Sequence, residues 1–320
     1  MSVMITGING MTGLHTAKLL LEKGLEVVGY DNNLNGELAF YPEVEAKIRF
    51  VWGDITHFGH LLGTVEENGV EQIIHLAALR NEVLYKAMPT ELLRVNIGGL
   101  TNILELARSG KIKRVIFASS AAVYGKIDDP GQRIAEDAPL DPAGIYANSK
   151  AMCESLCRAY RNVYDVDVLV LRPSRVYGRM ANLDTLEFGN PISSFVYRLL
   201  QGESIEEPGG ADFGGDFTYV PDLAFGCYRA LVVPSPQNWI FNISNGVFYR
   251  LSDVAAALAE LFPKASISIG PGMYPYITQS PMRGPLDIGR AKKELSFSVA
   301  RDLKGSLEHF IENLRQRQAL

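Results

Sequence analysis

Three glycines recur at intervals of three residues near the start of the chain, at Gly7, Gly10 and Gly13. They follow an apolar run at 3–5 and open a helix-like stretch at 14–23. In a strand–turn–helix unit, the first glycine permits a tight turn, the second lets the backbone approach a pyrophosphate, and the third lets the helix pack close to the strand. The N-terminus of the helix offers free N–H groups and a partial positive charge to phosphates. The spacing therefore predicts a dinucleotide-binding loop, with a plain glycine-rich turn as the alternative.

Asp31 ends the second apolar run, at 25–30, about 20 residues after the glycines. A carboxylate at this place accepts hydrogen bonds from both ribose hydroxyls of an adenosine and repels a 2′-phosphate. We therefore expect NAD to be the cofactor in preference to NADP. The alternative is a solvated turn aspartate before Asn32 and Asn33.

Strand-like and helix-like segments alternate through the first half of the chain. Strands are expected near 3–6, 25–30, 48–52, 72–76, 113–118 and 166–171. Helices are expected near 13–23, 57–67, 91–109 and 146–163. This alternation predicts an α/β fold, a doubly wound parallel sheet of the Rossmann type with helices on both faces.

Beyond residue 171 the alternation is lost. Segments rich in Gly, Pro and aromatic residues lie at 179–192, 203–217 and 270–286, and helices are expected near 192–201, 251–261 and 302–317. We expect an NAD-binding Rossmann domain at 1–171, to which later strands near 216–245 return, and a smaller, mainly substrate-binding lobe at 172–320. Open α/β sheets bind ligands at the carboxyl ends of their strands, so we expect the active site in the cleft between the two units.

The composition limits the classes of function. The 320 residues are 47% hydrophobic and 21% charged, as is usual for a globular protein. A net charge of −5 leaves no surplus of basic residues to bind the phosphates of nucleic acid. The sequence contains no run of about 18 apolar residues, so we expect no membrane span. The first expected strand starts within three residues of Met1, so we expect no signal peptide and a cytoplasmic location.

The cysteines and histidines carry no metal-binding pattern. The three cysteines, Cys153, Cys157 and Cys227, lack metal-ligand spacing, and we interpret them as small core or interface residues in a reducing compartment. The five histidines form no cluster, and we interpret them as structural: His15, His57, His60, His75 and His309. We therefore expect no metal site.

Tyr146 and Lys150 stand four residues apart at the start of a predicted helix. Residues at this spacing lie on one helical face, so the hydroxyl and the ammonium group can reach one site. A tyrosine ordinarily ionises only near about pH 10, and a nearby cation favours its ionised form. We expect Lys150 and the positive nicotinamide ring to let Tyr146 act as a base near neutrality, with two helix-surface residues as the alternative.

The strand before this helix ends in Ser119 and Ser120. A hydroxyl at the carboxyl end of a strand faces the cleft of a doubly wound sheet. It can hydrogen-bond the oxygen of a substrate alcohol or ketone. A serine that only forms a turn is the alternative.

Taken in order, these motifs resemble those of the extended short-chain dehydrogenases/reductases. The resemblance is to the NAD-dependent epimerase/dehydratase family, with its UDP-galactose 4-epimerase-like sugar epimerases, and it covers essentially the whole chain. The residues that carry it are the glycine turn at 7–13, Asp31, Gly53-Asp54-Ile55, His75-Leu76-Ala77-Ala78, Asn96, Ser119-Ser120-Ala121-Ala122-Val123-Tyr124-Gly125, Tyr146 with Lys150, and Leu171-Arg172-Pro173.

The resemblance implies a role for each matching residue. Tyr146 is the implied base, Lys150 tunes it and holds the nicotinamide ribose, and Ser120 orients the substrate oxygen beside Ala121. Asn96 is the implied fourth catalytic residue. Among the implied cofactor contacts, Asp54 and Ile55 would meet the adenine, and Ala77 and Ala78 would line the cofactor channel. The full implied cofactor-binding set is Gly7, Asn9, Gly10, Met11, Gly13, Asp31, Asn32, Asp54, Ile55, Leu76, Ala77, Ala78, Arg80, Tyr146, Lys150 and Pro173.

The resemblance also implies a reaction. Tyr146 takes the proton of a sugar hydroxyl while hydride passes from the same carbon to NAD, and an epimerase returns the hydride to the other face of the ketone. Three functions compete: this sugar epimerase, a dehydrogenase of a sugar, sugar acid or hydroxy acid that releases NADH, and a non-catalytic NAD-sensing regulator. The intact Ser120, Tyr146 and Lys150 disfavour the regulator. Dehydratases of the family carry an acidic pair where this chain has Ala121 and Ala122, which disfavours dehydration.

The substrate side departs from the family pattern. Gly215 stands where nucleotide-sugar members usually carry an arginine, and Arg175 stands where they typically have an asparagine. Arg283 keeps a second phosphate-type arginine. Losing a bidentate arginine removes a strong charged contact. We therefore expect UDP and other nucleoside diphosphates to bind weakly, and a smaller anionic carbohydrate, held by Arg175, Arg179 or Arg283, to be turned over better than a nucleotide sugar. Each arginine could equally form a surface salt bridge.

The expected partners are a small-molecule carbohydrate and a second copy of the chain, with no nucleic acid and no membrane. Family members often dimerise through the helices that correspond to 92–109 and 147–163. The apolar side chains of Met152, Leu156, Ala159 and Val163 fit such a homodimer, and equally fit burial within the monomer.

Overall fold

The computed structural model describes residues 1–80, 88–125, 131–179, 191–275 and 282–318. Its largest element is a seven-stranded parallel sheet with strand order β10-β6-β5-β4-β1-β2-β3. The strands are β1 (Ser2–Thr6), β2 (Glu26–Asp31), β3 (Arg49–Trp52), β4 (Val70–His75), β5 (Arg114–Ala118), β6 (Val168–Pro173) and β10 (Ile240–Ile243). The predicted α/β fold of the Rossmann type is confirmed.

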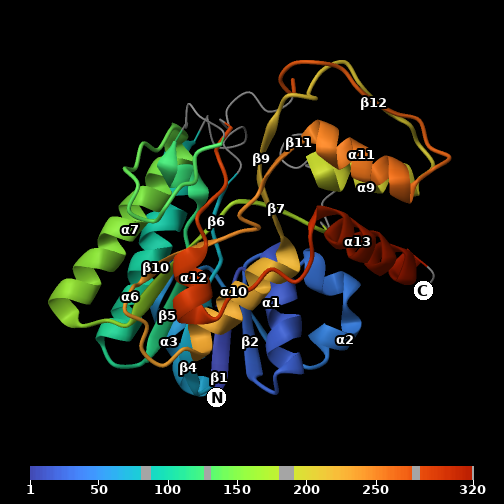
Figure 1. Ribbon diagram of the computed structural model, residues 1–320. Coiled ribbons are helices and arrows are strands. Elements are labelled where there is room, and N and C mark those ends of the chain that lie inside the picture. Colours follow the sequence, from blue (N-terminus) through green and yellow to red (C-terminus); the bar gives the residue numbers. More distant parts are fainter. Residues whose placement is uncertain (81–87, 126–130, 180–190, 276–281, 319–320) are drawn as a thin grey trace.

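Helices cover both faces of this sheet (Figure 1). One face is covered by α1 (Met11–Glu22), α10 (Val220–Val232) and α12 (Gly289–Leu295), and the other by α3 (Phe58–Glu67), α6 (Gly99–Arg108) and α7 (Gly144–Tyr164). The strands alternate accordingly: in β1, Val3 and Ile5 belong to the first core and Met4 to the second. Burial on both faces explains why these strands read as continuous apolar runs.

A second lobe lies beyond the carboxyl ends of the strands (Figure 1). It contains a three-stranded sheet of order β11-β9-β7 and a two-stranded sheet of order β12-β8. These strands are β7 (Arg175–Tyr177), β8 (Ile205–Glu207), β9 (Gly214–Tyr219), β11 (Phe248–Arg250) and β12 (Ile267–Ile269), and the helices around them are α9 (Pro191–Leu200), α11 (Leu251–Leu261) and α13 (Leu303–Gln318). Side chains from these helices and from β9 share a third core.

Several short elements complete the described chain. They are η1 (Glu37–Phe40), α2 (Pro42–Glu45), α5 (Pro89–Leu93), the π-helical turn η2 (Arg94–Gly98) and η3 (Ala121–Tyr124). The single helix predicted at 91–109 is therefore α5, η2 and α6 in succession.

Helix α10 lies inside the stretch at 216–245 where strands were expected. Pro221 and Asp222 in its first turn are helix-start signals, and the buried Leu223, Cys227 and Leu231 form the stripe that packs on the sheet. Of the strands in this stretch, β10 lies in the main sheet beside β6, whereas β9 pairs with β7 and β11 in the separate sheet. The domain boundary at residue 171 stays a prediction.

The strand order reverses between β1 and β4, which are adjacent in the sheet. The loops that leave these two strands diverge to opposite faces, and open α/β sheets bind their ligands at such a switch point. The glycine turn follows β1 and residues 76–80 follow β4.

Candidate active site

The glycine loop leaves no room for side chains at its first and third positions. Gly7 has φ +74°, and a Cβ there would lie 2.7 Å from the backbone nitrogen of Ala77. A Cβ on Gly13 would collide with the carbonyl oxygen of Gly7. Gly10 is the N-cap of α1. The loop thus brings bare backbone and a helix N-terminus to the switch point, a cradle that fits the pyrophosphate of a dinucleotide.

Asp31 lies at the end of β2 beside this loop. Its Oδ2 accepts a hydrogen bond from the Asn9 backbone N–H at 2.9 Å, and its Oδ1 accepts one from Asn33 N–H at 2.9 Å. Burial raises the pKa of Asp31, and backbone N–H groups, including that of Asn32, oppose the rise. A fixed, half-buried acceptor next to the cradle fits the ribose of an adenosine.

At the end of β3, Asp54 and Ile55 are both anchored. Asp54 Oδ1 accepts hydrogen bonds from the backbone N–H and the hydroxyl of Thr56, each at 2.8 Å, and the Arg94 guanidinium lies 3.7 Å from Oδ2. Ile55 is buried, and its carbonyl accepts a bond from Asn102. Asp54 therefore lies just beyond the carboxyl end of β3, with its carboxylate partly occupied by Thr56 and Arg94.

The segment after β4 packs against the end of β1. The backbone N–H of Leu76 bonds the carbonyl of Thr6, and Thr6 Oγ1 lies 2.7 Å from His75 Nδ1. Burial, with a smaller effect of the Lys150 charge, lowers the pKa of His75 to about 3. Ala77 and Ala78 are half-buried, and Arg80 is exposed at the end of the described segment.

Asn96 sits on the π-helical turn η2. Its Oδ1 accepts a hydrogen bond from Leu79 N–H at 2.8 Å, while Nδ2 donates to Leu79 O and to Ser149 Oγ, each at 3.0 Å. The side chain thus ties the segment after β4 to α7 one residue before Lys150. π-helical turns are frequent at functional sites, and here the turn places the Asn96 amide between Leu79 and Ser149.

Tyr146 and Lys150 come together on the first two turns of α7. Lys150 is buried, and its Nζ donates to the carbonyl of Ala118 at 2.7 Å, at the end of β5. The same Nζ lies 5.9 Å from the centre of the Tyr146 ring and 4.8 Å from that of Phe117. The ammonium group therefore stands between the phenol and the end of β5.

The two serines after β5 point in different directions. Ser119 is buried, and its hydroxyl donates to Glu154 Oε1 at 2.5 Å. Ser120 is half-buried and is the N-cap of η3, accepting a bond from Ala122 N–H at 3.1 Å. Of the pair, Ser120 is the one placed at the surface of the site, where the sequence assigned the substrate contact.

A buried ion pair supports this catalytic face. Arg172 donates to both carboxylate oxygens of Glu154, at 2.9 and 2.5 Å, and its Nη1 donates to the Tyr124 hydroxyl at 2.8 Å. Tyr124 in turn donates to Asn242 Oδ1 at 2.7 Å. The sequence reasoning missed Glu154, Tyr124 and Asn242. The spacing of Glu154, four residues after Lys150 and so on the same helical face, was the signal that could have identified it.

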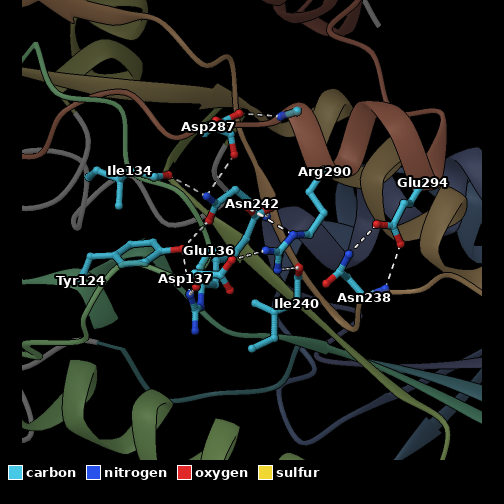
Figure 2. A network of polar contacts seen from close by, with 12 residues as sticks. Tyr124, Ile134, Glu136, Asp137, Asn238, Ile240, Asn242, Asp287, Arg290 and Glu294 are labelled. Carbon is cyan, nitrogen blue, oxygen red and sulfur yellow. Dashed lines mark hydrogen bonds and ion pairs between the residues drawn. The ribbon is translucent and has the colours of Figure 1, made fainter.

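Figure 2 shows how this network continues from Tyr124 and Asn242 to Asp287 and Arg290. Asn242 Nδ2 donates to the carbonyls of Ile134 and Asp287, at 2.9 and 3.1 Å. Glu136 accepts a bond from Asn242 N–H and lies 3.6 Å from Arg290 Nε. Strand β10 thereby holds together the catalytic and the substrate sides.

On the substrate side, the charge of Arg283 acts on Arg175, whereas Arg179 packs against Phe40. Arg283 Nε donates to the carbonyl of Gly125 at 2.8 Å, at the end of η3. Burial, and then the charge of Arg283, lower the pKa of Arg175 to about 10. Arg179 instead stacks on the ring of Phe40, 3.9 Å from a Glu37 oxygen, so it belongs to the cofactor side.

The remaining expected residues lie where these elements place them. Ala121 is buried in η3, Pro173 is buried at the end of β6, and Met11 begins α1. Within the described ranges no group of three metal-ligating side chains is found. No helix in the same part of the chain has the length and apolar character needed to cross a bilayer.

Comparison with known proteins places these features in a family. The sequence profile of the NAD dependent epimerase/dehydratase family matches residues 3–244. The UDP-glucuronate 4-epimerase of Thermodesulfobacterium geofontis is 30% identical over 71% of this chain and 71% of its own length. The UDP-glucose 4-epimerase of Mycolicibacterium smegmatis is 28% identical over 99% of both chains.

A solved structure of a UDP-glucose 4-epimerase is also similar to this chain along nearly its whole length. The UDP-glucose 4-epimerase of Thermus thermophilus, in complex with NAD, superposes with a TM-score of 0.84 at 25% identity. The match covers 98% of this chain and 99% of that one.

Proposed function

The chain belongs to the NAD-dependent epimerase/dehydratase family, and from that premise we propose that this NAD-dependent sugar epimerase acts on a carbohydrate that carries an anionic group. The substrate is a nucleotide sugar or a smaller anionic carbohydrate. The sequence favours the smaller one because Gly215 replaces an arginine. The relatives support the sugar class, since they are named as UDP-glucuronate and UDP-glucose 4-epimerases.

NAD would be held by the glycine loop and by Asp31, with Asp54 at the adenine end. When bound, it supplies an acceptor that takes a hydride from a sugar carbon and returns it. The side chains at the start of α7 and at the N-cap of η3 orient the substrate and move the proton. The Ser120 hydroxyl orients the reacting oxygen, Tyr146 removes its proton, and Lys150 stabilises the phenolate through its charge.

One observation carries this proposal. The Lys150 ammonium bonds the end of β5 at 2.7 Å and lies 5.9 Å from the Tyr146 ring centre. The glycine loop leaves the same edge of the same sheet two strands away, because β4 alone separates β1 from β5. A base, its cation and a dinucleotide cradle therefore share one edge.

The test starts with the cofactor state of the purified protein. We expect bound NAD to be released on denaturation, because an epimerase regenerates its cofactor. The protein is then incubated with UDP-glucose, UDP-glucuronate, free sugar acids and sugar phosphates. The 4-epimers are separated by chromatography while absorbance at the NADH band is followed. Epimer formation without NADH accumulation supports the proposal. Stoichiometric NADH release would identify a dehydrogenase instead.

We also propose that the protein is a cytoplasmic homodimer. Met152 and Val163 on α7 are 50% and 67% exposed, a large apolar area to leave in water on one helix. All three cysteines are buried and unpaired, which fits a reducing compartment. Sedimentation velocity with Val163→Glu checks the dimer, which we expect this variant to weaken.

A further inference from the structure

Gly215 lies on the face of β9 that Arg175 shares. Strands β7 and β9 are parallel and pair Arg175 with Phe217, so these two side chains project to the same face. Gly215 is two residues before Phe217 and therefore shares that face. It is buried, yet a Cβ built on it would meet no atom within 4 Å. The face of β9 is hollow at this position.

The Arg175 side chain spans the level of Gly215 on this face, more than 4 Å from a Cβ built on the glycine. Its guanidinium carbon lies 5.2 Å from the centre of the Phe213 ring, and Phe213 is two residues before Gly215. The side chain thus starts opposite Phe217 and ends over Phe213. A guanidinium that packs on an aromatic face is held in one orientation and stays charged. The missing side chain at 215 leaves this path clear.

Arg283 approaches from the catalytic side. Its Nε is used by the Gly125 carbonyl, which directs the guanidinium to the end of η3, five residues after Ser120. Burial lowers the pKa of Arg283 to about 10, and the proximity of Arg283 lowers that of Arg175. Two half-buried cations that repel each other are relieved by an anion bound between them.

We propose that Arg175 and Arg283 form a two-guanidinium clamp for one anionic group of the substrate, and that Gly215 is part of the clamp because its bare backbone lets Arg175 reach it. The clamp rests on the proposed function for the identity of the substrate, but its anion affinity is a property of the two arginines. Phosphate, diphosphate and carboxylate share the chemistry it recognises, which is two oxygens that accept planar N–H donors. The clamp makes residue 175 the specificity determinant.

The test measures anion binding to the NAD-loaded protein by calorimetry. The probes are UDP, which carries a diphosphate, and free glucuronate, which carries a carboxylate. Arg175→Gln removes one guanidinium, and we expect binding of the recognised anion to weaken about 10- to 100-fold. Arg250→Gln is the control: it removes the same charge from an exposed arginine of the same three-stranded sheet, and we expect less than about a twofold change.

A pair of variants at Gly215 tests the geometry separately. Gly215→Glu and Gly215→Gln place side chains of equal size in the hollow. Only the glutamate neutralises Arg175, so we expect it to bind the anion at least about tenfold more weakly than the glutamine variant. The double variant Arg175→Gln with Gly215→Arg returns a guanidinium to the same face. We expect it to recover at least about threefold of the lost affinity.

Each outcome decides the proposal. Loss of UDP binding in Arg175→Gln with glucuronate binding unchanged assigns the clamp to a diphosphate, and the reverse assigns it to a carboxylate. Unchanged binding of both probes, with a thermal midpoint like the wild type, overturns the clamp. Equal affinity of the Gly215→Glu and Gly215→Gln variants overturns the role of the hollow. Because binding is measured without turnover, a protein that proves not to be an epimerase still answers the question.

Discussion

The cofactor and catalytic half of the site and its substrate half are built in different ways. In the first, residues that act together are close in sequence: Gly7 and Gly13 shape one loop, and Tyr146 and Lys150 share one helical face. In the second, the guanidinium of Arg175 lies over the ring of Phe213 from a distant segment, and the charge of Arg283 from another segment acts on it.

This difference indicates which positions of the chain can be substituted to change substrate specificity. Substitutions at 175 and 215 alter the shape and charge of the substrate half, and both residues lie on strands of the second lobe, outside α7 and the glycine loop. Specificity can therefore shift while the chemical step stays intact.

The largest effect is expected from the ion pair under the catalytic face. Arg172→Met leaves the carboxylate of Glu154 buried without its partner, and both side chains are less than 5% exposed. Breaking a buried pair costs about 3–5 kcal/mol in the free energy of unfolding. Chemical denaturation measures it.

The second lobe provides the matched control. Lys304 on α13 pairs with Glu260 on α11 at 2.5 Å, and the two side chains are 47% and 63% exposed, so water can replace either partner. We expect Lys304→Met to leave the free energy of unfolding almost unchanged, because an exposed ion pair contributes little. Equal losses of unfolding free energy in the two variants would show that the ion pair under the catalytic face stabilises the fold no more than the pair in the second lobe. Replacing Arg172 and Glu154 together by Met should recover much of the loss.

The next effect concerns chemistry. Tyr146→Phe keeps the ring and removes the ionisable oxygen, so we expect turnover to fall at least ~10²-fold, within the range of general-base catalysis. NAD binding should stay nearly unchanged. Steady-state kinetics and cofactor titration measure the two quantities.

Tyr160→Phe is the control on the same helix. The Tyr160 hydroxyl bonds Glu105 at 2.6 Å, away from the site, so its loss should leave turnover close to that of the wild type. Near-normal turnover of Tyr146→Phe would rule this residue out as the base.

Acid should affect the two halves with opposite signs. Burial lowers the pKa of His75 to about 3, so the unfolded chain takes up the proton first, near the ordinary imidazole pKa of about 6.5. Stability from this group is therefore lost as the pH falls below about 6.5. Between pH 7 and pH 5 the loss is about 2 kcal/mol. We expect His75→Gln to be less sensitive to acid than the wild type by this amount in denaturant unfolding.

Asp216 on β9 is the counterpart in the substrate lobe. Burial raises its pKa to about 6, so the folded state takes up the proton first. Stability rises as the pH falls from about 6 towards about 4, by about 1.4 kcal/mol between pH 7 and pH 5. Asp216→Asn should remove this gain. Identical pH slopes in the wild type and both variants would contradict both assignments.

The smallest effect concerns cofactor choice. Asp31→Ala removes an acceptor beside the glycine loop, and we expect NAD affinity to fall about tenfold. The preference for NAD over NADP should relax, because the repulsion of a 2′-phosphate is lost. Fluorescence titration with both cofactors measures it, and Asp31→Asn separates charge from shape. Equal affinity of the wild type for NAD and NADP would show that Asp31 does not face the ribose.

Sequence alone was sufficient wherever short-range geometry decides the structure. The glycine spacing predicted a tight turn at Gly7, where φ is +74°, and close helix packing at Gly13, because only the absence of Cβ permits them. The Tyr146–Lys150 spacing predicted a shared face because an α-helix repeats every 3.6 residues. The alternation of apolar runs predicted the parallel sheet.

The resemblance singled out Ser120, but only the tertiary structure showed what occupies its neighbour Ser119, whose hydroxyl donates to Glu154 from another element. It likewise placed Arg179 on the ring of Phe40 and next to Glu37. It brought Arg175 across the hollow at Gly215 through the pairing of β7 with β9. These contacts join segments tens of residues apart. Hydrophobic periodicity and local propensity say which face a residue takes, whereas strand order and packing determine which distant residue it meets there.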